Sequence, residues 1–263
     1  MTNVLKTSLR RGALVMLCAA AVAAHPVAAL AVTAATHQDA LPKAADLLAK
    51  TVAAMGGADA IKAIKSIRAK GTFEMPAQSI SGTVEVIQAR PSFMRLLIDI
   101  QGIGLADNGT DGKIAWNVDP MNGPSLLTGK ALAEMKAESL FDGQLFGADY
   151  VKSATTLEKT KFGESPAYKI KLVTVFDTER TIYLDADSYL LIGSESVSET
   201  PMGAMPTTTS TGAYKKFGLL MQPTTMVQTA MGFDQIIRLS SFEYDAVPMS
   251  AFDPPAAIKA LIK

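Results

Sequence analysis

From Ser66 onward the sequence alternates between apolar and polar residues, and this alternation recurs through most of the remaining chain. In the segment from Ser66 to Met75, Ile67 and Phe73 fall on one face of an extended chain, whereas Lys70 falls on the other. A burial period of two is typical of a β-strand that packs on a core with one face only. The alternation therefore predicts a mainly β fold in which most strands have one buried face.

The alternation continues in residues 80–88 and 93–100, and the breaks at Pro76 and at Arg90-Pro91 are too short to hold crossover helices. Neighbouring strands joined by such short connections must be antiparallel. Further strands are expected at Lys113 to Val118, Ala154 to Lys161, Ala167 to Phe176, Arg180 to Leu184, Tyr189 to Ser198, Thr207 to Lys216, Gln222 to Thr229 and Gln235 to Tyr244. About eleven strands separated by regular turn signals predict one large, strongly curved antiparallel sheet or barrel.

Two segments have helical spacing instead. The segment from Pro42 to Ala54 combines an early proline with apolar residues on one side and is followed by Gly56-Gly57, which predicts one short amphipathic helix. The segment from Thr128 to Leu140 is rich in helix formers and interrupts the run of strands. We therefore expect an N-terminal helix and a later helical excursion from the sheet.

The first 35 residues resemble an export signal, with basic residues at Lys6, Arg10 and Arg11 and an apolar stretch of about a dozen residues that is shorter than a membrane-spanning helix. Small residues allow cleavage after Ala29 or Ala35. The expected division is thus a signal peptide over 1–35 and one mature domain over 36–263, exported to the periplasm.

Charge and cysteine content restrict the function classes. The 25 basic residues include three in the signal, so the mature chain has 22 basic against 25 acidic residues and lacks the positive charge that nucleic-acid binding requires. The single cysteine, Cys18, also lies in the signal, and Leu17 before it does not fit a lipid-attachment site. We expect no disulfide, no lipid anchor and no spanning segment after cleavage.

No catalytic or metal-binding motif stands out. His37 is the one histidine of the mature chain, which excludes a histidine-dependent triad and the usual zinc sites. The Asp185-x-Asp187 pair is typical of a hairpin turn, and Gly102-x-Gly104 lacks the rest of a dinucleotide loop. We predict no enzyme activity and no cofactor, although acidic side chains leave hydrolysis by a carboxylate pair as an alternative.

The segment from Gly82 to Pro120 resembles the family of the periplasmic lipoprotein carrier LolA. The order is a strand GTVEVIQ, Arg90-Pro91, a second strand, Asp111-Gly112-Lys113, Trp116 and Asp119-Pro120. The resemblance implies a half-open barrel closed by a helical lid, with Arg90 as the latch that holds the lid. The preceding MGGADAIKAIKSIRAKGTF resembles outer-membrane lipoprotein-sorting homologues of unassigned cargo.

The thirteen methionines of the chain favour a pliable apolar cavity. The residues expected to line it are Ile67, Phe73, Met75, Val84, Val86, Met94, Leu96, Ile98, Ile100, Ile114, Trp116 and Val118, with Leu132 and Met135 on the lid.

The prediction is a monomeric periplasmic carrier that shelters the acyl chains of a lipoprotein or another lipid and hands them on toward the outer membrane. It implies an inner-membrane donor and an outer-membrane acceptor as partners. The alternative is a non-catalytic structural or sensory envelope module that recognises lipoproteins or proteins with the same sheet.

Overall fold

The computed structural model describes residues 40–200 and 203–262 of the 263-residue chain. The predicted export signal lies outside the described residues. The first elements are the helices α1 (Ala44–Ala54), as predicted, and α2 (Ala58–Ala63). Helix α1 buries Leu47, Leu48 and Val52 on one side and ends before Gly56, whose φ of 122° is one that glycine adopts without strain.

Thirteen strands form one antiparallel sheet, which is not closed. Its spatial order is β6-β5-β4-β3-β2-β1-β15-β14-β11-β10-β9-β8-β7. The strands are β1 (Ser66–Met75), β2 (Ile80–Ala89), β3 (Phe93–Ile100), β4 (Gly104–Thr110), β5 (Ala115–Asp119), β6 (Gly123–Leu126), β7 (Val151–Phe162), β8 (Ser165–Thr174), β9 (Glu179–Asp185), β10 (Leu191–Thr200), β11 (Gly203–Gly212), β14 (Thr225–Ala230) and β15 (Phe233–Tyr244). A separate hairpin pairs β12 (Lys215–Phe217) with β13 (Leu220–Gln222).

The sheet consists of two meanders that meet at its centre. Strands β1 to β6 lie side by side in chain order, as do β7 to β11 followed by β14 and β15, and the β1–β15 pair joins the two sets. The chain leaves the first meander at one edge strand, β6, and enters the second at the other, β7. The connection between the edges holds helix α3 (Gly129–Ser139) and the 3₁₀ helix η2 (Phe141–Leu145).

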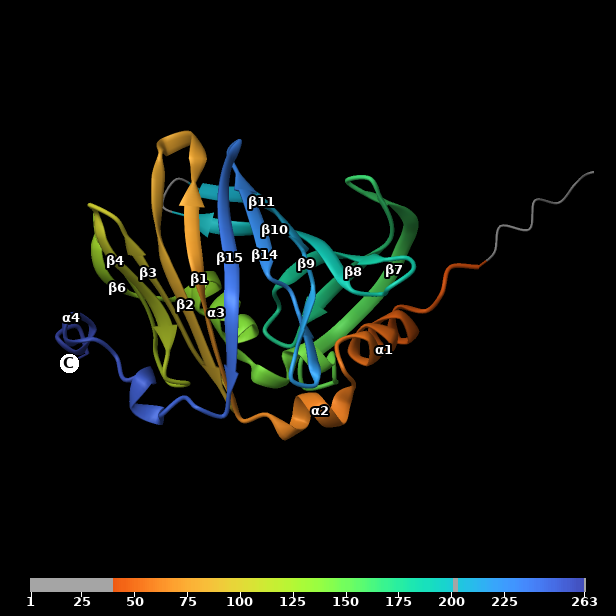
Figure 1. The fold of residues 1–263 in the computed structure, drawn as a ribbon, viewed down its shortest axis with the longest axis horizontal. Coiled ribbons are helices and arrows are strands. Elements are labelled where there is room, and N and C mark those ends of the chain that lie inside the picture. The colour runs from red at the N-terminus through yellow and green to blue at the C-terminus, as the bar shows by residue number, and fades with distance from the viewer. Residues whose placement is uncertain (1–39, 201–202, 263) are drawn as a thin grey trace, which may run out of the picture. The chain divides into compact units, whose positions relative to one another are not determined.

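Helix α3 contacts both β4 and β10, so it crosses one face of the sheet between its two halves (Figure 1). We call this the inner face and the opposite one the outer face. On the inner face, α1, α3 and Tyr150 pack against Ile170, Leu172, Ile182 and Leu184 of the second meander. The helical segment predicted at 128–140 is therefore a cover that is tethered to both edges of the sheet.

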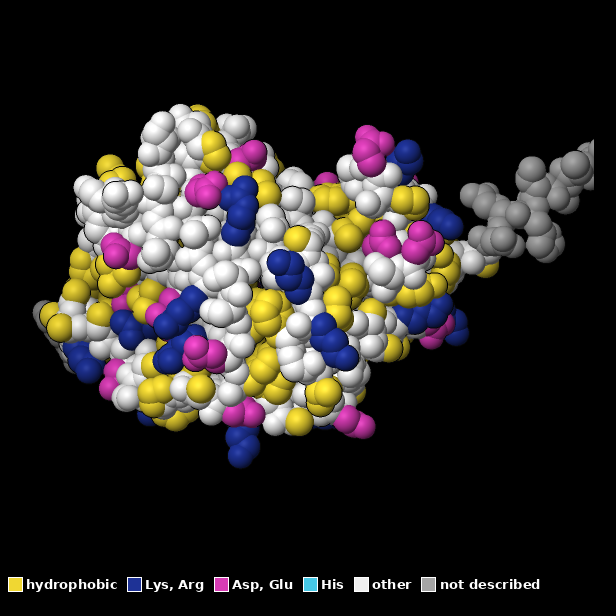
Figure 2. All heavy atoms as spheres, in the orientation of Figure 1, with side chains coloured by type: hydrophobic (Ala, Val, Ile, Leu, Met, Phe, Trp, Pro, Cys, Tyr) yellow, Lys and Arg dark blue, Asp and Glu magenta, His cyan; other side chains and the backbone are white. Residues whose placement is uncertain are grey.

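The outer face is covered in part by the C-terminal residues. The 3₁₀ helix η3 (Met249–Phe252) places Phe252 against Ile87, Ala89 and Phe93, and helix α4 (Ala256–Lys259) packs on β5 and β6. Elsewhere the outer face carries many polar and charged side chains beside apolar ones such as Leu97, and Figure 2 shows both charge signs over β1 and β15. Each strand of the first meander thus has a different environment on its two faces.

The prediction of a mainly β fold with one antiparallel sheet is confirmed. The sheet has 13 strands, more than the predicted number of about eleven. The sequence GLADNGT of β4 lacks the β-branched and aromatic residues typical of strands, and β6 has four residues including Pro124. Both strands form because neighbouring strands pair with them. In β4, the buried Asp107 also forms an ion pair with Arg95 of β3.

Candidate functional site

The inner face of the first meander is apolar. The strand registers align three rows across β1, β2 and β3: Ala69, Val86 and Leu96; Gly71, Val84 and Ile98; and Phe73, Gly82 and Ile100. Ile67, Met75 and Met94 project to the same side by alternation. The structure thus places nine of the predicted lining residues on one face.

The second meander extends this apolar face. Leu239 lies opposite Gly71 and Ile237 opposite Phe73, and Met226 on β14 pairs with Ile237. These residues form one cluster with Phe73 and Val84. They were absent from the predicted lining because no local pattern shows that β15 pairs with β1.

Burial differs across the apolar face. Phe73 and Val84 at its centre are 4% and 2% exposed, so side chains fill this part. Around them Met75, Val86 and Leu96 are half-buried, as are Ile98, Ile100, Met226 and Ile237. Each half-buried side chain leaves apolar area exposed to water. Covering this area with a ligand contributes about 25 cal/mol of binding free energy per Å². The inner face therefore offers an apolar surface that the chain itself covers incompletely.

Three predicted lining residues were assigned to the wrong face. Trp116 pairs with Gly109 and Val118 pairs with Asp107, so the side chains of Trp116 and Val118 project to the outer face. Ile114, two residues before Trp116, projects to the same face by alternation. Trp116 is fully buried, and its Nε1–H donates to Oδ1 of Asp107 (3.1 Å). The prediction took apolar character as a sign of the inner face, whereas the C-terminal segment gives the outer face a core of its own.

Trp116 emission is consequently expected to be insensitive to cargo on the inner face. Titration with a fatty acid below its micelle threshold should leave the emission maximum unchanged, whereas deletion of residues 249–262 should shift it to longer wavelength by exposing the indole. Fluorescence spectroscopy of both proteins checks this. An emission change that saturates with fatty acid in the full chain would place Trp116 near the cargo and contradict the assignment.

Helix α3 presents different side chains to the two halves of the sheet. Leu132 and Met135, predicted for the lid, lie on this helix, where Leu132 is half-buried and Met135 is 9% exposed. Lys130, Glu134 and Glu138 follow at intervals of four residues, which aligns them in one stripe along the helix. This stripe borders a cleft against the second meander.

Arg90 joins three parts of the chain at the base of the lid. Its Nε–H donates to the carbonyl of Ile64 (2.7 Å) and an Nη2–H donates to that of Ile61 (3.0 Å), where α2 ends. Its Nη1 forms an ion pair with Asp142 in η2, and the guanidinium lies 4.7 Å from the ring centroid of Phe141. These contacts reach the segment that follows α3 and the end of α2, and none reaches a carbonyl within α3 among the described residues.

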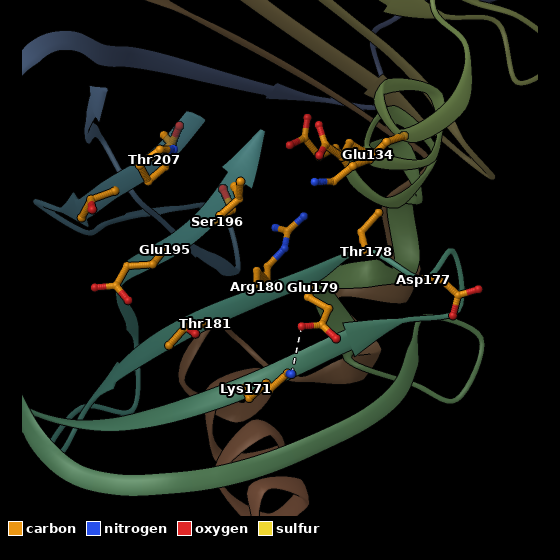
Figure 3. A pocket seen from close by; sticks show the side chains of 15 residues that line it. Glu134, Lys171, Asp177, Thr178, Glu179, Arg180, Thr181, Glu195, Ser196 and Thr207 are labelled. Atoms are coloured by element: carbon orange, nitrogen blue, oxygen red, sulfur yellow. Dashed lines mark ion pairs between the residues drawn. The ribbon is translucent and has the colours of Figure 1, made fainter. Parts of the chain in front are cut away.

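The cleft between α3 and strands β8 to β11 has a volume of about 610 Å³ (Figure 3). Most of its lining residues are polar, with charged side chains from both the helix and the sheet. The surrounding protein raises the pKa of Glu138 by excluding part of its water, although its side chain still reaches solvent, and the nearby Arg180 opposes this rise. The sequence does not predict this cleft, because charged residues on half-exposed strands give no distinctive pattern.

Two further kinds of feature concern the part of the chain that the structure describes: metal sites and membrane-spanning helices. No group of three or more His, Cys, Asp or Glu side chains is arranged to hold a metal ion among these residues. None of the described helices is both long and apolar enough to cross a membrane.

Two solved structures have a similar fold. The LolA superfamily protein NE2245 from Nitrosomonas europaea aligns with a TM-score of 0.55 and 14% sequence identity over 81% of this chain and 99% of that chain. A DUF1329 family protein from Desulfovibrio piger aligns with a TM-score of 0.56 and 9% identity over 82% of this chain and 100% of that chain. No family model and no curated protein matches the sequence.

Proposed function

We propose that this chain, which has the LolA-like fold, carries a lipid-like cargo whose acyl chains lie on the apolar inner face. The observation that supports the proposal most directly is the half-buried apolar surface of β1–β3, β14 and β15, on the face of the sheet that α3 crosses. In this role the protein binds and releases its cargo without chemical change.

Helix α3 supplies the means of release. Each sheltered methylene contributes about 0.8 kcal/mol, so an acyl chain binds strongly to any apolar surface large enough to hold it. Met135 and Ala137 of α3 are buried against the protein, so cargo that takes their place must displace the helix. Closing restores the ion pair between Arg90 and Asp142 and the buried contacts of Met135, which opposes retention.

The proposed setting is the periplasm, after cleavage of the signal over residues 1–35. A carrier of this kind would take its cargo from a donor at the inner membrane and deliver it to an acceptor at the outer membrane. The cargo is the acylated end of a lipoprotein or a free lipid, since the inner face recognises acyl chains in either form.

Adjacent leucines on β3 provide the test. Leu96 lies on the inner face and Leu97 on the outer face, and both are half-buried. We expect Leu96→Gln to weaken acyl-chain binding about tenfold, because burying a leucine contributes about 1.5–3 kcal/mol and 1.4 kcal/mol corresponds to a factor of ten. Leu97→Gln should have little effect. Binding of a fluorescent fatty acid checks both.

Mass spectrometry of lipids extracted from gently purified protein gives an independent readout. Wild type and Leu97→Gln should retain acyl lipids, and Leu96→Gln should retain less. Equal binding by the two variants, or a correctly folded wild type that neither copurifies with lipid nor binds fatty acid, would contradict the carrier role. The second result would favour a structural or sensory module.

A further inference from the structure

The cleft beside α3 opens through the sheet itself. The pairing of β9 with β10 ends at Thr181 and Glu195, although both strands extend further. Residues beyond this point line the cleft from both faces of the sheet, with Arg180 and Ser196 on the inner side and Glu179 and Val197 on the outer side. The cleft is therefore a lateral opening that leads from the exterior toward the inner face.

Arg180 occupies the middle of this opening. Figure 3 shows its side chain pointing from β9 toward α3, with Glu134 pointing into the same space from the helix. Several neighbouring charges are already paired: Lys171 with Glu179 (2.9 Å) and Asp177 with Lys152. Within the described part of the chain, the guanidinium of Arg180 forms no ion pair with a carboxylate at such a distance.

The surroundings of Arg180 change when the helix moves. Glu138 and Arg180 are close enough to influence each other electrostatically, so the helix supplies negative charge across the cleft. Displacing α3 removes Lys130, Glu134 and Glu138 together, which withdraws one positive and two negative side chains from the cleft. The sheet then presents the five N–H donors of Arg180 beside the hydroxyl groups of Ser196 and Thr207, on the same face as the apolar side chains of β14 and β15, from which β10 and β11 separate it.

We propose that Arg180 binds the phosphate of an amphipathic lipid whose acyl chain lies on the inner face, and that Glu134 and Glu138 balance its charge when the protein is empty. This deepens the proposed function and depends on it. Guanidinium groups bind phosphate oxygens in bidentate geometry, and a half-buried site strengthens these hydrogen bonds relative to water. A cleft of about 610 Å³ falls within the usual size of small-ligand sites.

Two lipids that differ only in phosphate test the proposal. We would measure binding of 1-palmitoylglycerol 3-phosphate and of neutral 1-palmitoylglycerol, both below their micelle thresholds, to the full mature chain. Wild type should bind the phosphorylated lipid about tenfold more tightly. Arg180→Gln should bring the two affinities together by weakening only the phosphorylated lipid. Glycerol 3-phosphate without a chain, tested alone, should bind far more weakly than the lipid.

Arg238→Gln is the control, since Arg238 is an exposed arginine of β15 that pairs with Glu74 on the outer face. It should leave the preference for phosphate intact. Glu138→Gln, which changes only an accessible side chain of α3, should strengthen binding of the phosphorylated lipid several-fold. This variant keeps the proposal testable if Arg180→Gln does not fold.

The outcomes separate the two proposals. Binding of both lipids by wild type with equal affinity, or a preference that Arg180→Gln leaves unchanged, would overturn the phosphate site and leave the carrier role intact. Binding of neither lipid would overturn the carrier role as well. Tight binding of glycerol 3-phosphate alone, reduced by Arg180→Gln, would show a site for free phosphate esters and contradict the lipid assignment.

Discussion

Replacing Asp107 with alanine is expected to lower the free energy of unfolding by about 3 kcal/mol, the largest effect of any single change considered. Asp107 accepts hydrogen bonds from Nε and Nη2 of Arg95 (2.9 and 2.6 Å) and from Nε1 of Trp116 (3.1 Å). Its side chain is 4% exposed and that of Arg95 is 18% exposed. Alanine leaves a largely buried guanidinium and an indole N–H without their acceptor, and urea denaturation measures the loss.

Asp99→Ala is the matched control, because Asp99 is an exposed aspartate on the outer face of the neighbouring strand β3. Its effect should stay within about 0.5 kcal/mol. The double variant Asp107→Leu with Arg95→Met should recover most of the stability, since an apolar pair of similar volume can replace a buried ion pair. A loss below about 1 kcal/mol for Asp107→Ala would show that the network contributes little.

Arg90→Leu is expected to loosen the base of the lid. The change removes two hydrogen bonds to the end of α2 and the ion pair with Asp142, whose side chain is 34% exposed and therefore partly screened. Of these contacts only the ion pair joins Arg90 to the lid segment, and it contributes about 1 kcal/mol to closure, so amide exchange over residues 127–150 should accelerate about fivefold. Hydrogen-exchange mass spectrometry measures this rate.

A more open lid should hold cargo more tightly and release it more slowly, because the closed state that competes with binding is less stable. Arg68→Leu is the control: Arg68 pairs with Glu85 on the outer face and, like Arg90, has a side chain that is 24% exposed. It should change neither exchange over 127–150 nor handover. If Arg90→Leu also left both unchanged, Arg90 would not be a latch.

Much of the fold follows from local patterns in the sequence. Alternation predicts most strands, short connections predict their antiparallel pairing, and helical spacing predicts α1 and α3 within a few residues. The resemblance of residues 82–120 to the LolA family is confirmed at the level of the fold. Strand β4 was missed because Asp107 and its neighbours resemble a loop until Arg95 and Trp116 are placed beside them.

The candidate site was harder to predict because it depends on long-range pairing. Alternation divides each strand into two faces but does not show which face another element covers. Trp116 was therefore assigned to the inner face, although Phe252 and the rest of the C-terminal segment give the outer face its own buried side chains. Arg180 was not singled out at all, since its importance depends on the opening between β9 and β10 and on a helix from another part of the chain.

The pairing of β1 with β15 has a consequence for the order in which the chain can fold. Each meander can form from hairpins that are local in sequence, but Ile67 meets Tyr244 only after nearly the whole chain has been synthesised. Until then β1 is an edge strand with unpaired backbone groups beside an apolar surface, a state prone to intermolecular association. Strand β15, the last to be made, thus joins the two aggregation-prone meanders into a single sheet. A nascent chain that stops before Phe233 leaves β1 and β14 as exposed edge strands.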